Sequence, residues 1–406
     1  MTARTKLVCG VALAIAAAVH LWWTITNGPE VIRAQGDTLV YRAGALAWMD
    51  GRPVYTDPLT LELQAGQMFF TYGPLALGIF APLAALPVDL SFAVLAVLSW
   101  LALLAALIVW CRSLEWSRSD PVLIGLACTL LLGLTIPMQH HLYFGQVNAF
   151  LLLLASLDLV LRRTPWPRGM LLGLAIAIKI TPAAILLLPL LRRDWRTILV
   201  AGATAAAGVL ASWVIVPREA SYFWFTAFRN PDRVGNLRSP NNQSIRAVFE
   251  RWIDGPLGGA MWLGASLVVV ALVSWIVLKV LLPRGDELGA VAVVFLLPVL
   301  LSPVAWTHHW VWSFPVVLWL VDKARQGSMG AAALAASGVL VLAFFPIDSF
   351  DPARLIPGAA EWSAIDAALA GGYVYWAMVV LLALPFLRIS ETEPDGVRVE
   401  DEPAAA

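Results

Sequence analysis

Residues 88–110 read VDLSFAVLAVLSWLALLAALIVW, and Asp89 is the one charged residue among them. A helix needs roughly 20 apolar residues to cross the hydrocarbon core of a bilayer. Nine other apolar runs, several of them shorter, lie at residues 7–25, 121–138, 147–161, 197–216, 260–282, 288–301, 310–321, 330–345 and 373–387. The sequence therefore predicts an all-α polytopic membrane protein.

The composition of the 406-residue chain excludes several classes of protein. Hydrophobic residues make up 60% and charged residues 13%, with a mean hydropathy of +0.78, which leaves too few charges for a soluble surface. The same composition excludes a disordered chain. Lys+Arg and Asp+Glu both number 27, so no net basic field attracts nucleic acid. The three cysteines, Cys9, Cys111 and Cys128, show neither metal-ligand spacing nor a disulfide framework.

The two ends of the chain differ in character. The first apolar run follows Lys6 and continues through Trp22 and Trp23 without a small-residue cleavage site, so we expect a retained span with its N-terminus inside. Residues 1–388 are expected to form a single transmembrane domain. The acidic stretch 389–406, which contains Pro and Ala, is expected to be a disordered cytoplasmic tail.

Residues 169–191, GMLLGLAIAIKITPAAILLLPLL, are long enough to span, but Lys179 and Pro182 interrupt them and arginines flank both ends. A hairpin that returns to the inner side puts 16 Lys and Arg in inner loops and 10 in outer loops, whereas a span gives 14 and 12. The positive-inside rule therefore predicts the hairpin. Broken helices at membrane depth are tolerated where they line a cavity. This topology places Asp37 and the loop 218–254 on the outer side.

Two charged residues are candidates for chemistry. Asp37 follows the first span, where a carboxylate can accept a proton from a bound hydroxyl. The alternative is a helix cap or a partner for Arg42. Lys179 stands among Ala, Ile and Leu, where an unpaired ammonium is costly, so we expect it to face a polar cavity or an anion. Snorkelling from a hairpin tip is the alternative.

The predicted outer loop 218–254 carries six arginines and the stretch RSPNNQS at 238–244. Positive charge on the outer side works against the usual topological bias. Clustered arginines suit phosphate, which accepts bidentate hydrogen bonds. Pairing with Asp232, Glu250 or Asp254, or with lipid headgroups, is the alternative.

Two pairs of adjacent histidines lie at predicted outer boundaries: His140–His141, and His308–His309 within SPVAWTHHW at 302–310. Neighbouring side chains on a helix do not point the same way, so a two-histidine metal clip is not expected. One imidazole can donate a hydrogen bond to a phosphate or sugar oxygen, while the other caps or packs. The second pair carries more weight because aromatic residues surround it.

Aromatic residues and prolines between residues 41 and 82 predict short helices along the outer surface. Aromatic faces stack on sugar rings, although interfacial Tyr and Trp are usually plain anchors. Motifs of soluble enzymes are absent: there is no Gly-rich phosphate loop, no Gly-x-Ser-x-Gly, no His-Glu-x-x-His and no Asp-x-Asp. A donor that is itself a membrane lipid needs none of these, so we expect no metal site and no cofactor.

The order and spacing of short motifs resemble glycosyltransferase family 87, whose members are membrane-embedded C-type (GT-C) transferases that use polyprenyl-phosphate sugars. The similarity runs from about Asp37 to Trp312 and covers most of the chain. Its motifs are Asp37 to Tyr41, GRPVY (51–55), FTYGP (70–74) with APL (81–83), GQVN (145–148), GL (173–174) to KITP (179–182), NQS (242–244), and SP (302–303) to WTHHW (306–310). The family often has Pro where Gly73 stands here. Within the family, the chain looks like mycobacterial-type α-1,2-mannosyltransferases.

The resemblance implies a GT-C bundle of about 10 to 12 transmembrane helices, with short helices and loops on the outer side. It implies a polyprenyl-phosphate-mannose donor, and a phosphatidylinositol mannoside or lipomannan-type acceptor on the outer face of the plasma membrane. Asp37 would be the base of an inverting displacement that forms an α-1,2 linkage. We expect the donor phosphate at Lys179, His308 and Arg238. We expect the substrates at Tyr41, Tyr72, Asn242, Gln243, Trp306 and His309.

Two other classes of function stay open. A transporter or flippase of a lipid-linked sugar would use the same cavity and arginines without Asp37 as a base. A structural partner in an envelope-synthesis complex would need no chemistry. The absence of a clean inverted repeat, together with Asp37 and a histidine pair near the membrane boundary, favours the enzyme. The sequence leaves open the sugar, the acceptor glycolipid and the oligomeric state.

Overall fold

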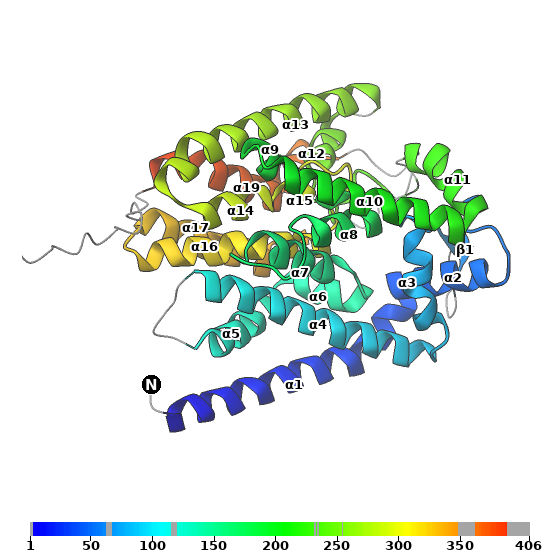
Figure 1. Cartoon of the computed structure of the whole chain (residues 1–406), viewed down its shortest axis with the longest axis horizontal. Coiled ribbons are helices and arrows are strands. Elements are labelled where there is room, and N and C mark those ends of the chain that lie inside the picture. Colours follow the sequence, from blue (N-terminus) through cyan, green and yellow to red (C-terminus); the bar gives the residue numbers. More distant parts are fainter. Residues whose placement is uncertain are drawn as a thin grey trace, which may run out of the picture.

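The computed structural model describes residues 3–61, 67–114, 120–230, 233, 235–253, 255–347 and 362–387. Over these residues it is almost entirely helical, with one two-stranded antiparallel sheet (Figure 1). The all-α class is therefore confirmed. The predicted tail at 389–406 lies outside the described residues.

The elements are named in chain order; η marks 3-10 helices, except η4, which is a π-helix. The first half of the chain contains α1 (Ala3–Gln35), α2 (Asp37–Met49), β1 (Leu59–Thr60), β2 (Gln67–Met68), α3 (Leu75–Ala84), α4 (Val88–Ser113), α5 (Pro121–Gly133), α6 (Ile136–Phe144), α7 (Asn148–Leu159), α8 (Met170–Ile178), η1 (Thr181–Leu186) and α9 (Leu187–Leu191). The second half contains α10 (Trp195–Ile215), α11 (Pro217–Phe225), η2 (Ala227–Arg229), α12 (Ile245–Trp252), α13 (Pro256–Ile276), η4 (Val277–Leu281), η5 (Leu282–Arg284), α14 (Glu287–Val294), α15 (Leu297–Leu300), η6 (Thr307–Ser313), α16 (Phe314–Arg325), α17 (Met329–Phe344), α18 (Ala364–Leu369), α19 (Gly372–Ala383) and η9 (Leu384–Phe386).

Four stretches of the described chain are long and apolar enough to cross a membrane. They are Thr5–Thr26 within α1, Val88–Ser113, Trp195–Ile215 and Pro256–Arg284. The pair α5 and α6 counts as a fifth only if it is one span, because an 84° bend separates the two helices. Most other predicted spans, such as α7 and α17, are apolar helices of 10–17 residues. The polytopic class is confirmed, while 10 to 12 crossings remain a prediction.

The hairpin path predicted for residues 169–191 is confirmed, while the side of the membrane to which it returns stays a prediction. α8 runs beside α10 in the same direction: a Cβ on Gly169 would lie 2.3 Å from the Thr197 carbonyl oxygen, and one on Gly173 would lie 2.4 Å from that of Ala201. The chain turns at Lys179, returns through η1 and α9, and then begins α10 next to the start of α8. Both basic flanks therefore lie on one side of the molecule, and Lys179 is at the tip.

A buried carboxylate fixes the start of this hairpin. Asp158, near the end of α7, accepts hydrogen bonds from the backbone N–H groups of Gly169 at 2.8 Å and Leu172 at 3.0 Å. Trp166 Nε1 donates to its other oxygen at 3.2 Å. A carboxylate at a helix N-terminus satisfies donors that the helix leaves unpaired. Gly169 has φ +100, which a side chain would strain, so the entry to α8 is closely specified.

Short elements gather at the end of the molecule opposite the N-terminus, where α2, α3, β1 and α11 lie (right in Figure 1). Interlocking aromatic rings join them: Tyr41 of α2 stacks on Phe80 of α3 with centroids 4.1 Å apart, and Tyr55 tilts against Phe223 of α11 at 5.1 Å. Such ring pairs add to the stability that burial alone provides. They support the first turn of α2, where Asp37 lies.

Candidate active site

Asp37 is the first residue of α2, but its side chain does not cap the helix. Gly36 occupies the cap position, and no side-chain cap is made there. The carboxyl instead accepts a hydrogen bond at Oδ2 from Gln146 Nε2. The guanidinium of Arg42 donates to two backbone carbonyls and to the Ser91 hydroxyl. The helix-cap alternative for Asp37 is therefore wrong.

The surroundings of Asp37 suit a group that takes up a proton. Burial raises the pKa of its carboxyl to about 6, although the hydrogen bond from Gln146 and the positive charge of Lys179 act in the opposite direction. α2 is not among the stretches that could cross the membrane. A carboxylate with a pKa near the working pH combines a useful ionised fraction with proton affinity. This pKa and this burial suit the base expected at Asp37, and that role stays a prediction.

Lys179 occupies an extended break between α8 and η1. Its Nζ lies 3.1 Å from His309 Nε2 and 5.2 Å from the centroid of the Tyr72 ring. The positive charge of Lys179 also favours the ionised form of the Asp37 carboxyl. An ammonium has no lone pair, so His309 Nε2 is the acceptor in this contact. Lys179 therefore faces a polar site, as predicted, instead of snorkelling toward a headgroup.

His308 lies beside these groups and is 5% exposed. Its ring contacts those of Phe144 and His309, with centroids 5.4 and 4.6 Å away. Neither ring nitrogen has a hydrogen-bond partner within the described part of the chain. Buried polar atoms usually have partners, so two such nitrogens close to Lys179 are open to a ligand.

Asp37, Gln146, Lys179, His308 and His309 are named the polar cluster below. They come from four separate parts of the chain: the start of α2, the turn after α6, the hairpin tip and η6. Four of them are sequence-predicted site residues: Asp37 as the base, Lys179 and His308 at the donor phosphate, and His309 at the substrates. These roles stay predictions. Across the described ranges, no three His, Cys, Asp or Glu side chains are arranged to hold a metal ion.

The first histidine pair ties neighbouring elements together. His140 Nδ1 lies 2.7 Å from Thr307 Oγ1, which joins α6 to η6. His141 Nε2 accepts the backbone N–H of Ala149 at 2.9 Å, near the start of α7. The His140 contact holds η6, the element of His308, against α6, and the His141 contact holds α6 to α7.

Tyr41 and Tyr72, the two tyrosines expected to contact the substrates, lie near Asp37 and bond to each other. Tyr41 is fully buried, and its hydroxyl lies 2.8 Å from that of Tyr72. Tyr72 donates in turn to Gln146 Oε1 at 3.2 Å. Tyr72 therefore contacts the polar cluster through both its hydroxyl and its ring, whereas Tyr41 supports it from the core. A substrate contact for either residue stays a prediction.

Asn242 and Gln243 hold the arginine-rich loop to the segment before η6. Asn242 pairs with Trp306 in a β-bridge, and its Oδ1 accepts the backbone N–H of Ala305 at 2.9 Å. Gln243 Nε2 donates to two backbone carbonyls at 2.6 and 2.7 Å, and its Oε1 accepts the N–H of Tyr373 at 3.2 Å. Both side chains are fully buried. The Asn242 amide therefore bonds the segment before η6, whereas the Gln243 amide bonds its own loop and the start of α19. A substrate contact for Asn242, Gln243 and Trp306 stays a prediction.

Several arginines of the segment 218–254 have structural partners. Arg251 is 2% exposed and donates to the carbonyls of Ser239 and Asn242 at 2.8 and 2.5 Å. Arg246 pairs with Glu250 at 3.1 Å. Arg238 is held through its backbone, since its N–H donates to Asn236 and its carbonyl accepts from Arg251. These contacts do not link the Arg238 guanidinium to the polar cluster, and its role at a phosphate stays a prediction. Asp232 and Asp254 lie outside the described residues.

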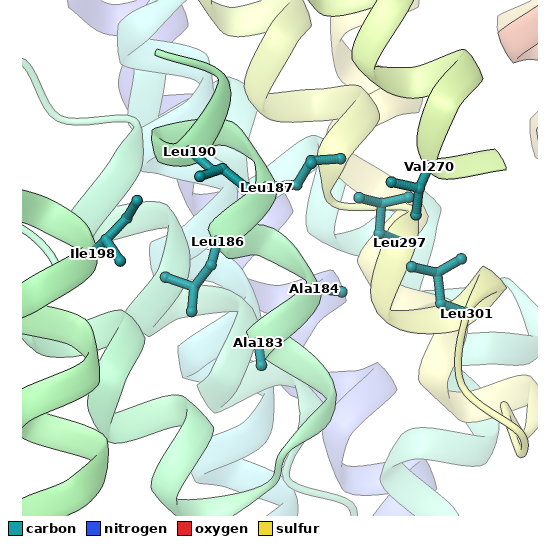
Figure 2. Close-up of a pocket in the computed structure, with 9 residues that line it drawn as sticks. All are labelled: Ala183, Ala184, Leu186, Leu187, Leu190, Ile198, Val270, Leu297 and Leu301. Atoms are coloured by element: carbon teal, nitrogen blue, oxygen red, sulfur yellow. The ribbon is translucent and has the colours of Figure 1, made fainter. Parts of the chain in front are cut away.

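A purely aliphatic cavity of about 330 Å³ adjoins the returning arm of the hairpin (Figure 2). Its lining comes from η1, α9, α10, α13, α15 and the residue that follows α15: Ala183, Ala184, Leu186, Leu187, Leu190, Ile198, Val270, Leu297 and Leu301. Ala183 and Leu301 lie at one end of the cavity and Leu190 at the other (bottom and top of Figure 2). Ala183 is four residues after Lys179, and Leu301 is seven before His308. The residues at that end are thus close in sequence to two members of the polar cluster.

Sequence reasoning missed the role of Gln146. The motif GQVN was noted as part of a resemblance, but no function was attached to its glutamine. The signal was present: a Gly that can end a helix is followed by two polar residues, Gln146 and Asn148, within an otherwise apolar stretch. Polar side chains there require partners, and the sequence does not show that the partner is Asp37.

Comparison with known proteins identifies the family of the chain. The profile of glycosyltransferase family 87 matches residues 70–303. A polyprenol-phosphate-mannose-dependent alpha-(1-2)-phosphatidylinositol mannoside mannosyltransferase of Mycolicibacterium smegmatis is 37% identical over 90% of this chain and 87% of its own length. A pentamannoside mannosyltransferase of the same species, with otherwise the same name, is 31% identical over 82% and 80%. An alpha-(1->3)-arabinofuranosyltransferase of Corynebacterium glutamicum is 26% identical over 85% and 79%. The chain is a membrane glycosyltransferase and belongs to glycosyltransferase family 87.

Proposed function

We propose that the chain transfers mannose from a polyprenyl-phosphate mannose to a phosphatidylinositol mannoside, forming an α-1,2 linkage. The reaction takes place on the outer face of the plasma membrane, and residues 1–388 form one catalytic domain. The observation that carries the proposal is the polar cluster, in which a carboxylate with a pKa of about 6 shares one site with a buried ammonium and a histidine open to a ligand.

The reaction needs one bond formed and one broken. The acceptor hydroxyl oxygen attacks the anomeric carbon of the donor mannose while the bond from that carbon to the phosphate oxygen breaks, with inversion. Asp37 takes the hydroxyl proton as the new bond forms. The polyprenyl phosphate leaves as an anion, so no general acid is required. Lys179 and His308 stabilise the charge that grows on it, and Arg238 is a further candidate.

The aliphatic cavity supports a lipid donor. In this proposal, the phosphate lies at Lys179 and the first isoprene units of the donor lie at the end of the cavity that Ala183 and Leu301 line. The apolar lining then removes those units from water or replaces lipid around them. Holding two lipid substrates in register contributes to the rate, because their encounter is no longer bimolecular.

The choice of sugar and acceptor follows the relatives. Identity is 37% to a protein named as a phosphatidylinositol mannoside mannosyltransferase, 31% to one named for the pentamannoside and 26% to an arabinofuranosyltransferase. This order favours mannose, with phosphatidylinositol mannoside as the acceptor class.

The test uses the purified chain in lipid nanodiscs with radiolabelled polyprenyl-phosphate mannose and a phosphatidylinositol mannoside acceptor. The wild type is expected to lengthen the glycolipid. Asp37→Asn is expected to retain folding and donor binding and to lose turnover, since an amide cannot accept the proton. A clearly active Asp37→Asn variant would refute the base assignment. Donor binding without any product from the wild type, for all acceptors tried, would favour a carrier of lipid-linked sugars instead.

A further inference from the structure

Gln146 occupies a tightly built turn between α6 and α7. Gly145 ends α6 in the left-handed region at φ +69, and the N–H of Gln146 donates back to the His141 carbonyl at 3.0 Å. This is the hydrogen-bond pattern by which a glycine after a helix satisfies its last carbonyls. A Cβ on Gly145 would lie 1.8 Å from Thr38 Oγ1, so the turn packs directly on the residue after Asp37. The Gln146 backbone is therefore fixed relative to α2.

The contacts of the Gln146 side chain determine which way its amide points. Oε1 accepts from Tyr72 Oη at 3.2 Å and from Asn148 Nδ2 at 3.3 Å. Both partners are donors here, so they select the amide oxygen and leave Nε2 to face Asp37 Oδ2. Tyr41 lies 2.8 Å from the Tyr72 hydroxyl and donates to it, because the Tyr72 proton is already directed at Gln146. The donors run in one direction, from Tyr41 through Tyr72 and Gln146 to Asp37, and such chains polarise one another.

We propose that Gln146 is a positioning residue, whose locked amide holds Oδ2 of Asp37 and leaves Oδ1 to take the acceptor proton. The inference rests on the function proposed above. Without Gln146, the carboxyl could rotate about its last bond and meet Lys179 with either oxygen. With Gln146 in place, Oδ2 of Asp37 accepts its hydrogen bond, and Oδ1 has no hydrogen-bond partner in the described part of the chain. The same bond stabilises the ionised carboxylate, as hydrogen bonds to a charged form do.

The groups that face Asp37 predict how its titration responds. Lys179 from the hairpin favours the ionised form, while Tyr41 and Tyr72 lie close enough to interact with its charge. Loss of the Gln146 donor removes one of the two influences that lower the pKa of Asp37. The acid limb of the pH–rate profile is therefore expected to move to higher pH, by about one unit. A merely structural role for Gln146 would lower activity without moving that limb.

Two variants and a matched control test this. Gln146→Glu keeps the size of the side chain and its contacts with Tyr72 and Asn148, but turns a carboxyl toward Asp37. Gln146→Ala removes the amide altogether. Ser99→Ala is the control, since Ser99 Oγ donates to the Gln146 backbone carbonyl at 3.2 Å and leaves the amide in place. Each is assayed for mannosyl transfer against pH. Each is also titrated by infrared spectroscopy for the protonated carboxyl band that Asp37→Asn removes.

In both Gln146 variants, the acid limb of the pH–rate profile and the midpoint of the infrared titration are expected to move together to higher pH. We also expect kcat to fall about tenfold or more, with the KM for the donor little changed. Ser99→Ala is expected to match the wild type in both. If the Gln146 variants fold but their acid limb and infrared midpoint stay at the wild-type pH, the positioning role is wrong. If the wild type forms no product but the infrared titration still moves in the variants, the proposed function fails and the positioning of Asp37 stands.

Discussion

Asp37 balances burial, which disfavours its charge, against two partners that favour it. Gln146 donates a hydrogen bond and Lys179 supplies a positive charge, and the pKa of the carboxyl still rises to about 6. If the site were wetter, the pKa would be lower and the carboxylate would be a weaker base. If Lys179 were absent, the ionised fraction near neutral pH would be smaller. The two residues therefore depend on each other for the proposed chemistry.

The first prediction concerns pH. The pKa of Asp37 is raised, and the base works in its ionised form, so transfer is expected to fall as the pH drops through about 6. Transfer is expected to fall again as the pH rises through about 8, because burial lowers the pKa of Lys179 to about 8 and the ammonium then loses its charge. One unit below the pKa of Asp37, the rate should be about tenfold lower than its maximum. A pH series of initial rates at saturating substrates measures this. A profile that stays flat down to pH 5 would show that Asp37 is not the group that limits the reaction.

The second prediction separates the two histidines of η6. His309 accepts from Lys179, so His309→Ala should release the ammonium and raise the KM for the donor roughly tenfold. His309→Gln offers an oxygen at a similar place and should recover part of that loss. The nitrogens of His308 are instead open to the phosphate, so His308→Ala should lower kcat, because the charge that grows on the leaving phosphate loses a hydrogen-bond donor. Equal losses in His309→Ala and His309→Gln would contradict this assignment.

Single residues show what a sequence can and cannot reveal about a site. Asp37 and Lys179 are visible because charge is rare and costly in an apolar chain. Gln146 is not, because its significance depends on a contact with a residue more than a hundred positions away. Asn242 and Gln243 are conspicuous for their polarity, yet their amides bond the backbone of neighbouring segments. The sequence shows which polar side chains need hydrogen-bond partners, whereas the identity of those partners depends on the fold.

At the scale of elements, the hairpin of α8, η1 and α9 brings the cation to the base. Its two arms could be predicted because arginines on both flanks make a through-going span unfavourable for topology. Its close packing on α10 could not, since that depends on glycines at particular points of contact. Gly169 and Gly173 let α8 approach the α10 backbone, and this approach sets how far the tip carries Lys179.

The third prediction tests that packing. Gly169→Ala places a Cβ 2.3 Å from the Thr197 carbonyl oxygen and forces φ +100 on a side chain, so it should destabilise the protein by about 2 kcal/mol or more. Gly202→Ala is the control: Gly202 is an exposed residue of α10 with nothing within 4 Å of the added methyl. Because Ala has a higher helix propensity than Gly, Gly202→Ala should leave the stability of the protein unchanged or raise it by up to about 1 kcal/mol. The midpoints of thermal unfolding of the two variants are compared in the same detergent. Equal midpoints would show that the added methyl at Gly169 does not destabilise the packing of α8 on α10.

For the whole molecule, hydropathy and charge give different kinds of information. Hydropathy identified an α-helical membrane protein, but it marked as spans several segments that fold as helices of 10–17 residues, and one that bends by 84°. Short and bent helices bury polar residues between them, which a count of apolar residues does not reveal. The distribution of Lys and Arg, by contrast, depends on topology alone, and it identified the hairpin.

The fourth prediction concerns orientation, and it belongs to the molecule as a whole. Single cysteines are placed at exposed positions by Arg163→Cys, Arg196→Cys and Thr56→Cys, in a chain whose native Cys9, Cys111 and Cys128 are replaced by Ala. A membrane-impermeant maleimide is applied to intact cells and to inverted vesicles. The charge bias of 16 to 10 puts positions 163 and 196 inside and position 56 outside. Labelling of 163 and 196 from opposite sides would contradict the hairpin. Labelling of both from the outside, with 56 reached only in inverted vesicles, would keep the hairpin and reverse the membrane orientation, moving the polar cluster to the cytoplasmic face.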